Sequence, residues 1–258
     1  MFVILQAINS EGLTKKYGVL CMCQSFVKSY VDYFGEAVQL PMAVRYTDSP
    51  MGELRVVAGC MFKQFHRVFN GEVLTFSTES LTCGGGKFYA GLAPMPERVY
   101  GFVSEFERYK SDPETAKASI AMIDACLSEK PYLNFIRLDK LESLDGVEGV
   151  LFFATPDVLS GLFTWANYDQ TDINAVQVPW GSGCSASITA MVNEERRGGK
   201  HCFLGMLDVS ARPYFKHDVL SFAVPANRFV EMVGTFSKCC VAGAPAWLKV
   251  KKRINAER

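Results

Sequence analysis

Two segments of the chain share a pattern that restricts its fold. "VLFFATPDVLSGLF" (150–163) and "VLSFAVPANRFVEM" (219–232) carry the same residue at five of their first seven positions, the last being Pro156 in one and Pro225 in the other. In each, an apolar run typical of a buried strand ends at a proline, which the first turn of a helix tolerates and a central strand excludes. The pattern predicts two related strand–proline–helix units in one sheet. Duplication with pseudo-symmetry and a chance likeness between two common junctions are both open.

The remaining segments predict further helices and strands around these two units. Amphipathic spacing predicts helices over residues 26–38, 62–69 and 111–130. The last begins at a capping residue, Ser111 or Asp112, followed by Pro113. Apolar runs predict strands over residues 39–47, 54–59, 72–77 and 132–138. Because no Gly/Ser linker interrupts the 258 residues, we expect a single domain of α/β or α+β class, with a mixed β-sheet flanked by helices.

Patterning at the two ends suggests how this domain is bounded. We expect residues 1–21 to be an N-terminal extension, residues 22–240 to form the globular domain, and residues 241–258 to be a basic, solvated tail. The opening apolar stretch lacks the preceding basic region and the following cleavage site of a signal peptide.

Charge and hydropathy exclude several classes of partner. Basic and acidic residues both number 27, so the formal net charge is zero and we expect no nucleic-acid partner. No apolar run approaches the roughly 20 residues that span a bilayer, so we expect no membrane partner. Nine cysteines without the spacing of secreted disulfide frameworks indicate a cytoplasmic protein. A homo-oligomer is left open.

Three cysteines have glycine neighbours that the other cysteines lack. Cys60 follows a glycine, Cys83 precedes three glycines in "TCGGGKFYAGL", and Cys184 follows a glycine in "PWGSGCSAS". Each glycine costs about 0.5–1 kcal/mol relative to alanine in ordinary structure, so these stretches need unusual backbone angles or a close approach to the main chain. Free backbone N–H groups beside a thiol would favour the thiolate, which is the form that binds metal or attacks electrophiles. The other cysteines are expected to be small buried side chains, among them Cys126, Cys202, Cys239 and Cys240.

The same stretches contain candidates for binding an anion. Backbone N–H groups of glycine-rich turns can cradle an anion, and a guanidinium suits bidentate binding of carboxylate or phosphate. The candidate ligand-binding residues are Gly84, Gly85, Gly86, Lys87, Gly183 and Arg212. For Arg212 a structural ion pair is an equal alternative. The stretch around Lys87 is not a phosphate loop, because Phe88 stands where that motif needs a hydroxyl.

Several of these landmarks occur in an order that is similar to a known family. They are "LPMAVRY", "LTCGGGKFYAGL", "VLFFATPDVLSGL", "GSGC", "LDVSARPYF" and "VLSFAVPANRFVEMV", spread over residues 38–233. In this order they resemble the uncharacterised ArCR family, domain of unknown function 169. The resemblance implies a soluble prokaryotic protein without an established activity, with Cys60, Cys83, Cys184 and Arg212 as shared site residues. Some members have additional cysteines before the matching arginine, where this chain has "DVSA" (208–211). A site of four thiolates is therefore not expected, and three cysteines plus another ligand remain.

Three hypotheses of function follow, and the sequence does not name a reaction. In the first, Cys60, Cys83 and Cys184 converge in a glycine-lined pocket and bind an iron–sulfur cluster or another metal, while Arg212 holds an anionic ligand. In the second, the pocket is a binding module for a small anion or cofactor, without catalysis. In the third, Cys184 is the nucleophile of an enzyme. No histidine lies near Cys184 in the sequence, which weighs against the third.

Overall fold

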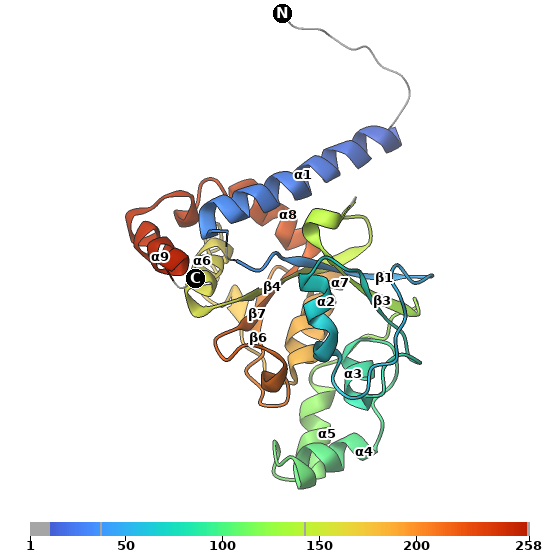
Figure 1. Cartoon of the computed structure of the whole chain (residues 1–258). Helices are drawn as coiled ribbons and strands as arrows, with labels where there is room; N and C mark the ends of the chain where they lie inside the picture. Colours follow the sequence, from blue (N-terminus) through green and yellow to red (C-terminus); the bar gives the residue numbers. More distant parts are fainter. Residues whose placement is uncertain (1–10, 37, 142, 257–258) are drawn as a thin grey trace, which may run out of the picture.

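The computed structural model describes residues 11–36, 38–141 and 143–256, and the side chains from residue 22 onward. Within these ranges seven strands form one sheet, in the order β2-β3-β1-β4-β7-β6-β5 (Figure 1). The strands are β1 (Met42–Thr47), β2 (Leu74–Phe76), β3 (Tyr132–Arg137), β4 (Val147–Ala154), β5 (Val176–Gln177), β6 (Cys202–Gly205) and β7 (Leu220–Pro225). Strand β5 pairs with β6 in parallel, and the other neighbours are antiparallel. The sheet is therefore mixed, and the fold is a single α+β domain as predicted.

The helices of the described ranges connect and cover these strands. They are α1 (Glu11–Phe34), α2 (Phe65–Phe69), α3 (Gly84–Tyr89), α4 (Arg98–Gly101), α5 (Pro113–Ala121), α6 (Pro156–Ala166), α7 (Ala190–Arg196), α8 (Ala226–Thr235) and α9 (Pro245–Ala256). Short helical turns are η1 (Met61–Gln64), η2 (Phe102–Phe106), η3 (Leu138–Lys140), η4 (Ser185–Thr189), η5 (Arg212–Tyr214) and η6 (Cys240–Ala242). No helix in the described part of the chain is both long and apolar enough to cross a membrane.

Each face of the sheet carries its own hydrophobic core. Helices α1, α6, α8 and α9 contribute to the core on one face, while α2, α3 and α7 contribute to the core on the other (Figure 1). Successive side chains of a strand point to opposite faces, so Phe152 enters the first core and Phe153 the second. Burial of one such side chain is worth about 1.5–3 kcal/mol. Cys184 belongs to the second core, which places the candidate site on that face.

The two predicted strand–proline–helix units lie side by side. Strand β4 continues into α6 and strand β7 into α8, and the two strands pair antiparallel with Val150 opposite Val224. Pro156 is the first residue of α6, whereas Pro225 ends β7 and caps α8. Neighbouring antiparallel strands, each followed by a helix on the same face, are compatible with local two-fold pseudo-symmetry. Whether the units arose by duplication stays open.

Two of the predicted elements differ from the structure. Residues 54–59 form isolated bridges, Leu54 to Thr75 and Val57 to Leu81, rather than a strand. The helix predicted over residues 111–130 ends at Ala121, because Asp124 adopts a left-handed φ of 51° that a continuing helix excludes. Leu127, which falls within the predicted helix, lies beyond this end and is 49% exposed. The predicted cap is confirmed, since Asp112 accepts a hydrogen bond from the Thr115 N–H at 2.7 Å.

The chain ends also differ from the predicted extension and tail. Helix α1 runs from Glu11 to Phe34 without a break at residue 22, and residues 1–10 of the expected extension lie outside the described residues. The end of the chain is not a solvated tail, because α9 packs on the domain. Its Trp247 is buried edge-on against Phe34 and donates a hydrogen bond to the Tyr33 carbonyl at 3.0 Å. The basic residues of α9 lie away from its buried residues Trp247 and Ile254. Composition alone did not indicate that this segment packs as a helix.

Candidate functional site

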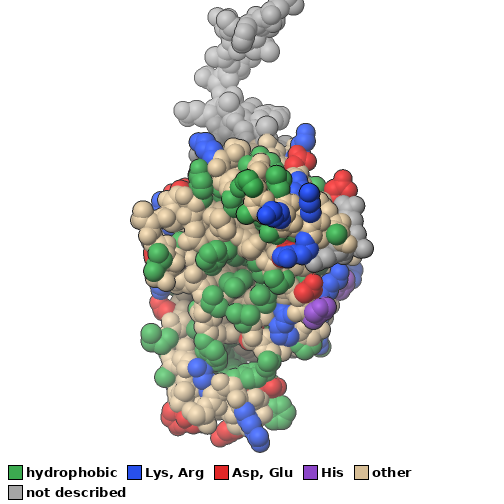
Figure 2. Space-filling view, turned by 90° about the vertical axis from the view of Figure 1, so that its left-hand side faces the viewer, with side chains coloured by type: hydrophobic (Ala, Val, Ile, Leu, Met, Phe, Trp, Pro, Cys, Tyr) green, Lys and Arg blue, Asp and Glu red, His purple; other side chains and the backbone are tan. Residues whose placement is uncertain are grey.

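One cavity of about 1060 Å³ is lined by all three of the glycine-flanked cysteines. Cys60, Cys83 and Cys184 are far apart in the sequence, and none of the three forms a disulfide. Residues of α3, η4 and β6 line one part of the cavity, and residues of α4 and η2 line another. Figure 2 shows one face of the molecule, on which hydrophobic side chains gather above the part formed by α4 and α5 in Figure 1. Within the described ranges no group of three or more His, Cys, Asp or Glu side chains is arranged to hold a metal ion.

Each of these cysteines lies directly before a helical turn. Cys60 precedes η1, Cys83 precedes α3, and Cys184 precedes η4, which continues into α7. The Cys83 sulfur accepts a hydrogen bond from the Gly86 N–H at 3.2 Å and so caps the first turn of α3. A β-carbon at Gly86 would stand 3.4 Å from this sulfur, in tight contact. The local sequence therefore holds the thiol against the backbone that follows it.

Gly84 and Gly183 serve close packing, whereas Gly59, the glycine before Cys60, has a left-handed φ of 78°. Residues 84–86 form the first turn of α3 with negative φ, so the alternative of a left-handed conformation is wrong there. A β-carbon at Gly84 would lie 2.9 Å from the Pro96 Cγ atom. At Gly183 it would lie 2.6 Å from the Met206 Sδ atom and 2.8 Å from the Ala211 Cβ atom. The chain around residues 206–211 can approach Cys184 only because residue 183 has no side chain.

Burial favours the protonated form of two of the thiols. Loss of solvent raises the pKa of Cys60 to about 11, and the charges of Cys83 and Asp208 add to the rise. The Phe62 backbone N–H lowers the pKa of Cys60, but by less than burial raises it. The pKa of Cys184 is also raised, by burial first and then by the charges of Cys60 and Cys83. The expectation that backbone N–H groups favour the thiolate is therefore wrong for these two residues, because desolvation outweighs the donors.

Two further polar side chains line this cavity, and each has one buried oxygen atom without a hydrogen-bond partner. The Oδ1 atom of Asp208 and the hydroxyl of Ser182 are buried without a hydrogen bond. The other carboxylate oxygen of Asp208 accepts a hydrogen bond from the Ser210 hydroxyl. Asp208 was noted in the sequence only as a departure from the family pattern.

The outer wall of the cavity is mainly apolar. It includes Phe102 and Trp180, which are 50% and 45% exposed, together with Val178, Leu207 and Val209. Both π-helical turns of the described chain, η2 and η4, contribute lining residues, and such turns occur frequently at functional sites. Among the lining residues Arg98 is the one lysine or arginine. The cavity therefore offers little positive charge to an anion.

Two of the predicted anion-binding residues lie elsewhere. The Arg212 guanidinium donates hydrogen bonds to the backbone carbonyls of Met206, Lys216, His217 and Val219. It closes the loop between β6 and β7 and does not line the cavity. Lys87 does not line it either, and its charge contributes to lowering the pKa of Glu79 after the stronger effect of the Ser77 hydroxyl. The sequence indicated neither interaction. Arg212 bonds to backbone carbonyls of its own loop, and the charge of Lys87 acts on Glu79.

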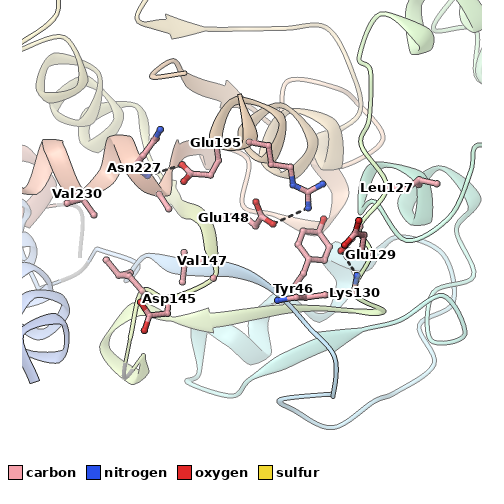
Figure 3. Close-up of a pocket in the computed structure, with 15 residues that line it drawn as sticks. Tyr46, Leu127, Glu129, Lys130, Asp145, Val147, Glu148, Glu195, Asn227 and Val230 are labelled. Atoms are coloured by element: carbon pink, nitrogen blue, oxygen red, sulfur yellow. Dashed lines mark hydrogen bonds and ion pairs between the residues drawn. The ribbon is translucent and has the colours of Figure 1, made fainter. Parts of the chain in front are cut away.

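A second cavity, of about 760 Å³, contains charged groups that are already paired (Figure 3). Arg196 forms an ion pair with Glu148 at 3.0 Å, and its guanidinium lies over the ring of Tyr46. Glu195 accepts a hydrogen bond from the backbone N–H of Asn227 at 2.8 Å, and burial raises the pKa of its carboxyl. These contacts engage Arg196, Glu148 and Glu195. The cysteine-lined cavity, in contrast, includes Asp208 and Ser182, each with a buried oxygen atom that has no hydrogen-bond partner.

The histidines and the remaining cysteines of the described residues do not line the cysteine-lined cavity. His201 bonds to Glu194 at 2.6 Å and to Asp172 at 3.3 Å, and the ring of His66 bonds to the Lys63 carbonyl. The predicted burial of the other cysteines holds for Cys202 and Cys239, while Cys240 is half-buried and Cys126 is exposed. Cys126 lies beyond the end of α5 at Ala121.

The fold and the site together define a single-domain α+β protein with a cavity lined by cysteines from three distant segments. Over residues 35–235 the sequence matches the family model of domain of unknown function 169, described as uncharacterised ArCR. The chain therefore belongs to this family, as the order of its landmarks predicted. Neither the curated proteins nor the solved structures contain a match to the chain.

Proposed function

We propose that the protein binds an iron–sulfur cluster, or another thiolate-bound metal, through Cys60, Cys83 and Cys184. One observation carries the proposal: three free thiols from distant segments line the same cavity. Thiolates are the usual ligands of iron–sulfur clusters and suit soft metals generally. Because the described side chains do not form a ready-made metal site, binding would draw the three cysteine-bearing turns closer together.

The donor set fits such a centre. A metal displaces the proton of a coordinating thiol outright, so the high pKa of Cys60 makes binding dependent on pH but does not prevent it. When bound, a cluster would supply electron transfer, or a Lewis-acidic iron at a position that no thiolate fills. The chain supplies thiolates from the turns before η1, α3 and η4, and the apolar wall around Trp180 limits access of water. Reduced cysteines require a reducing compartment, which supports a cytoplasmic location for the protein.

Purification without oxygen tests the proposal. After reconstitution with ferrous iron and sulfide, we expect protein-bound iron and sulfide and the broad visible absorption of a cluster. The triple variant C60S/C83S/C184S should lose all three, whereas C126S, which changes an exposed thiol outside the cavity, should retain them. Bound zinc without sulfide would support a thiolate-bound metal and reject the cluster. Colourless wild-type protein that binds neither iron nor zinc after this treatment would reject the proposal.

The apolar wall favours a second candidate, a module that binds an organic molecule without a metal. Cavities of several hundred cubic ångströms with mainly apolar linings are typical of small-molecule sites, and Phe102 and Trp180 provide aromatic surface here. An apolar naphthalene-sulfonate dye can probe this reading. Dye binding that is lost in W180A but unchanged in C60S/C83S/C184S would favour the second candidate. Displacement of the dye by metal reconstitution would favour the first.

The high pKa of the buried Cys184 thiol weighs against the enzyme with a cysteine nucleophile. The thiolate is the attacking species, and neither His66 nor His201 is bonded to this sulfur. An activity sensitive to iodoacetamide at near-neutral pH would revive that reading.

A further inference from the structure

We propose that Cys60 and Cys83 are a redox-active pair, which closes into a disulfide when a small-molecule disulfide reaches the cavity. Both thiols are free and half-buried, and both line the same cavity. The inference goes beyond the proposed function, because the pair can close whether or not the protein binds a metal. It starts from the backbone contacts that bring these two cysteines together from separate segments of the chain.

The two segments run side by side up to the cysteines. Val57 forms a parallel bridge with Leu81, and its carbonyl accepts a hydrogen bond from the Thr82 N–H at 3.2 Å. Further along, the Gly59 N–H donates a hydrogen bond to the Thr82 hydroxyl at 2.8 Å. These contacts therefore reach the residue directly before each cysteine.

This pairing sets the spacing of the two cysteines. Neighbouring strands lie about 4.8 Å apart, and the α-carbons of a disulfide are usually about 4.4–6.8 Å apart. The register of the bridge places Cys83 opposite Gly59, so Cys60 is one residue out of step. Gly59 has a left-handed φ of 78°, which turns the chain before Cys60 enters the lining of the cavity. The spacing of the two segments is thus of the size that a disulfide spans.

The electrostatics agree with this proximity. Burial raises the pKa of Cys60, the Phe62 backbone N–H opposes the rise, and the charge of Cys83 is the next influence. Cys184 responds first to burial and then to the charges of the other two cysteines, but it is only 7% exposed. A reagent from solution therefore reaches Cys60 or Cys83 first, and Cys184 is left over as the third thiol.

The reaction is thiol–disulfide exchange, in which the reagent is the oxidant. The thiolate of one cysteine attacks a sulfur of the reagent, breaks its S–S bond, forms a mixed disulfide and releases one reduced thiol. The thiolate of the second cysteine then attacks the protein sulfur of the mixed disulfide and releases the other reduced thiol. Two protein thiols are oxidised, one reagent disulfide is reduced, and the two protons pass to the released thiols. Disulfides of this kind in cytosolic proteins are usually transient and catalytic or redox-sensing.

Treatment of the metal-free protein with oxidised glutathione tests the pairing. C126S is the background, because the exposed Cys126 would form a mixed disulfide of its own. After acid quenching and alkylation, peptide mass spectrometry should find a peptide pair joined through Cys60 and Cys83. Adding C60S or C83S should stop the reaction at a mixed disulfide that carries one glutathione on the cysteine that remains. Adding C184S should leave the joined pair unchanged.

Other patterns of oxidation would overturn the inference. They are free thiols at both positions, mixed disulfides that persist on Cys60 and Cys83 in the background protein, and a disulfide of either one with Cys184. The same treatment of protein unfolded in urea is the reference, because unfolding removes the backbone contacts that hold the two segments together. A joined pair that forms equally well in the unfolded chain would also contradict the structural argument.

Zinc uptake separates this inference from the proposed function. A Cys60–Cys83 disulfide removes two of the three thiolates of the proposed metal centre, so with that centre the oxidised protein should lose the zinc that the reduced protein binds there. This expectation alone rests on the proposed function. Zinc is the probe because the sulfide needed for a cluster would reduce the disulfide, and C60S/C83S/C184S measures uptake by other groups.

The two inferences can then fail independently. Reduced protein that takes up no more zinc than C60S/C83S/C184S counts against a thiolate-bound zinc and leaves the mapped disulfide standing. Undiminished zinc uptake by protein whose Cys60–Cys83 disulfide has been mapped also counts against the metal centre alone. Zinc uptake that is lost only in the triple variant, with no joined pair after oxidation, supports the metal centre and overturns the redox pair.

Discussion

The reactivity of Cys60 in the metal-free protein can be worked out from its surroundings. Burial raises its pKa to about 11, against about 8.5 for a free cysteine. At pH 7.5 the thiolate fraction is then about 0.03%, compared with about 9% for a free thiol, a deficit of about 300-fold. A more basic thiolate is the better nucleophile, with a Brønsted coefficient of about 0.4–0.5, and this recovers a factor of about 10–15. Cys60 should therefore react about 20-fold more slowly than a free thiol with an aromatic disulfide reagent.

The pH dependence of labelling separates this effect from steric hindrance. Metal-free protein is labelled briefly at a series of pH values from 7 to 10, and mass spectrometry of the peptide that contains Cys60 gives its rate. The rate should rise about tenfold per pH unit over the whole range, because the thiolate fraction does so below the pKa. N-acetylcysteine labelled alongside is the reference. Hindrance alone would slow Cys60 equally at every pH, so a rate that levels off near pH 8.5 would refute the argument.

Three further predictions test packing and electrostatics. G183A inserts a β-carbon against Met206 and Ala211 and should cost about 1–3 kcal/mol by overpacking and reduce metal loading. G234A, on an open face of α8, should raise stability by about 0.5–1 kcal/mol; urea titration measures both, and equal effects would contradict the packing argument. Arg228 holds the pKa of Asp169 at about 2, so this carboxyl contributes stability that is present above about pH 3.9 and lost as the pH falls through 2. D169N should cost about 3 kcal/mol at pH 7, because Arg228 is fully buried, and a cost unchanged at pH 2 would refute this. Burial raises the pKa of Cys202 to about 12, so the folded state keeps a proton that the unfolded state releases above about pH 8.5. Stability should then fall by about 1.4 kcal/mol per pH unit above that value, and C202A should have a shallower slope in alkaline thermal melts.

The elements that local chemistry controls could be predicted from the sequence. A proline after a buried apolar run ends a strand and opens a helix wherever it occurs, so the units β4–α6 and β7–α8 were predictable. Asp112 caps α5 through atoms only three residues away. Glycine flanking also identified three cysteines that line one cavity, because close packing around a small site requires missing side chains. Each of these inferences depends on a few neighbouring residues.

Contacts that form only in the folded chain decided the rest. Arg212 was expected to bind a ligand, but carbonyl groups of its own loop already engage it. Trp247 turned an expected tail into a packed helix through a bond to Tyr33, a contact that spans almost the whole chain.

By itself the sequence determined the class of fold, the two strand–proline–helix units and the three thiols that line one cavity, since these follow from patterns within short stretches. Only the tertiary structure decided which groups stay unpaired. Whether a buried charge finds a partner depends on what the folded chain brings to it from elsewhere. That is why Arg212 is engaged by the backbone while an oxygen of Asp208 remains without a donor.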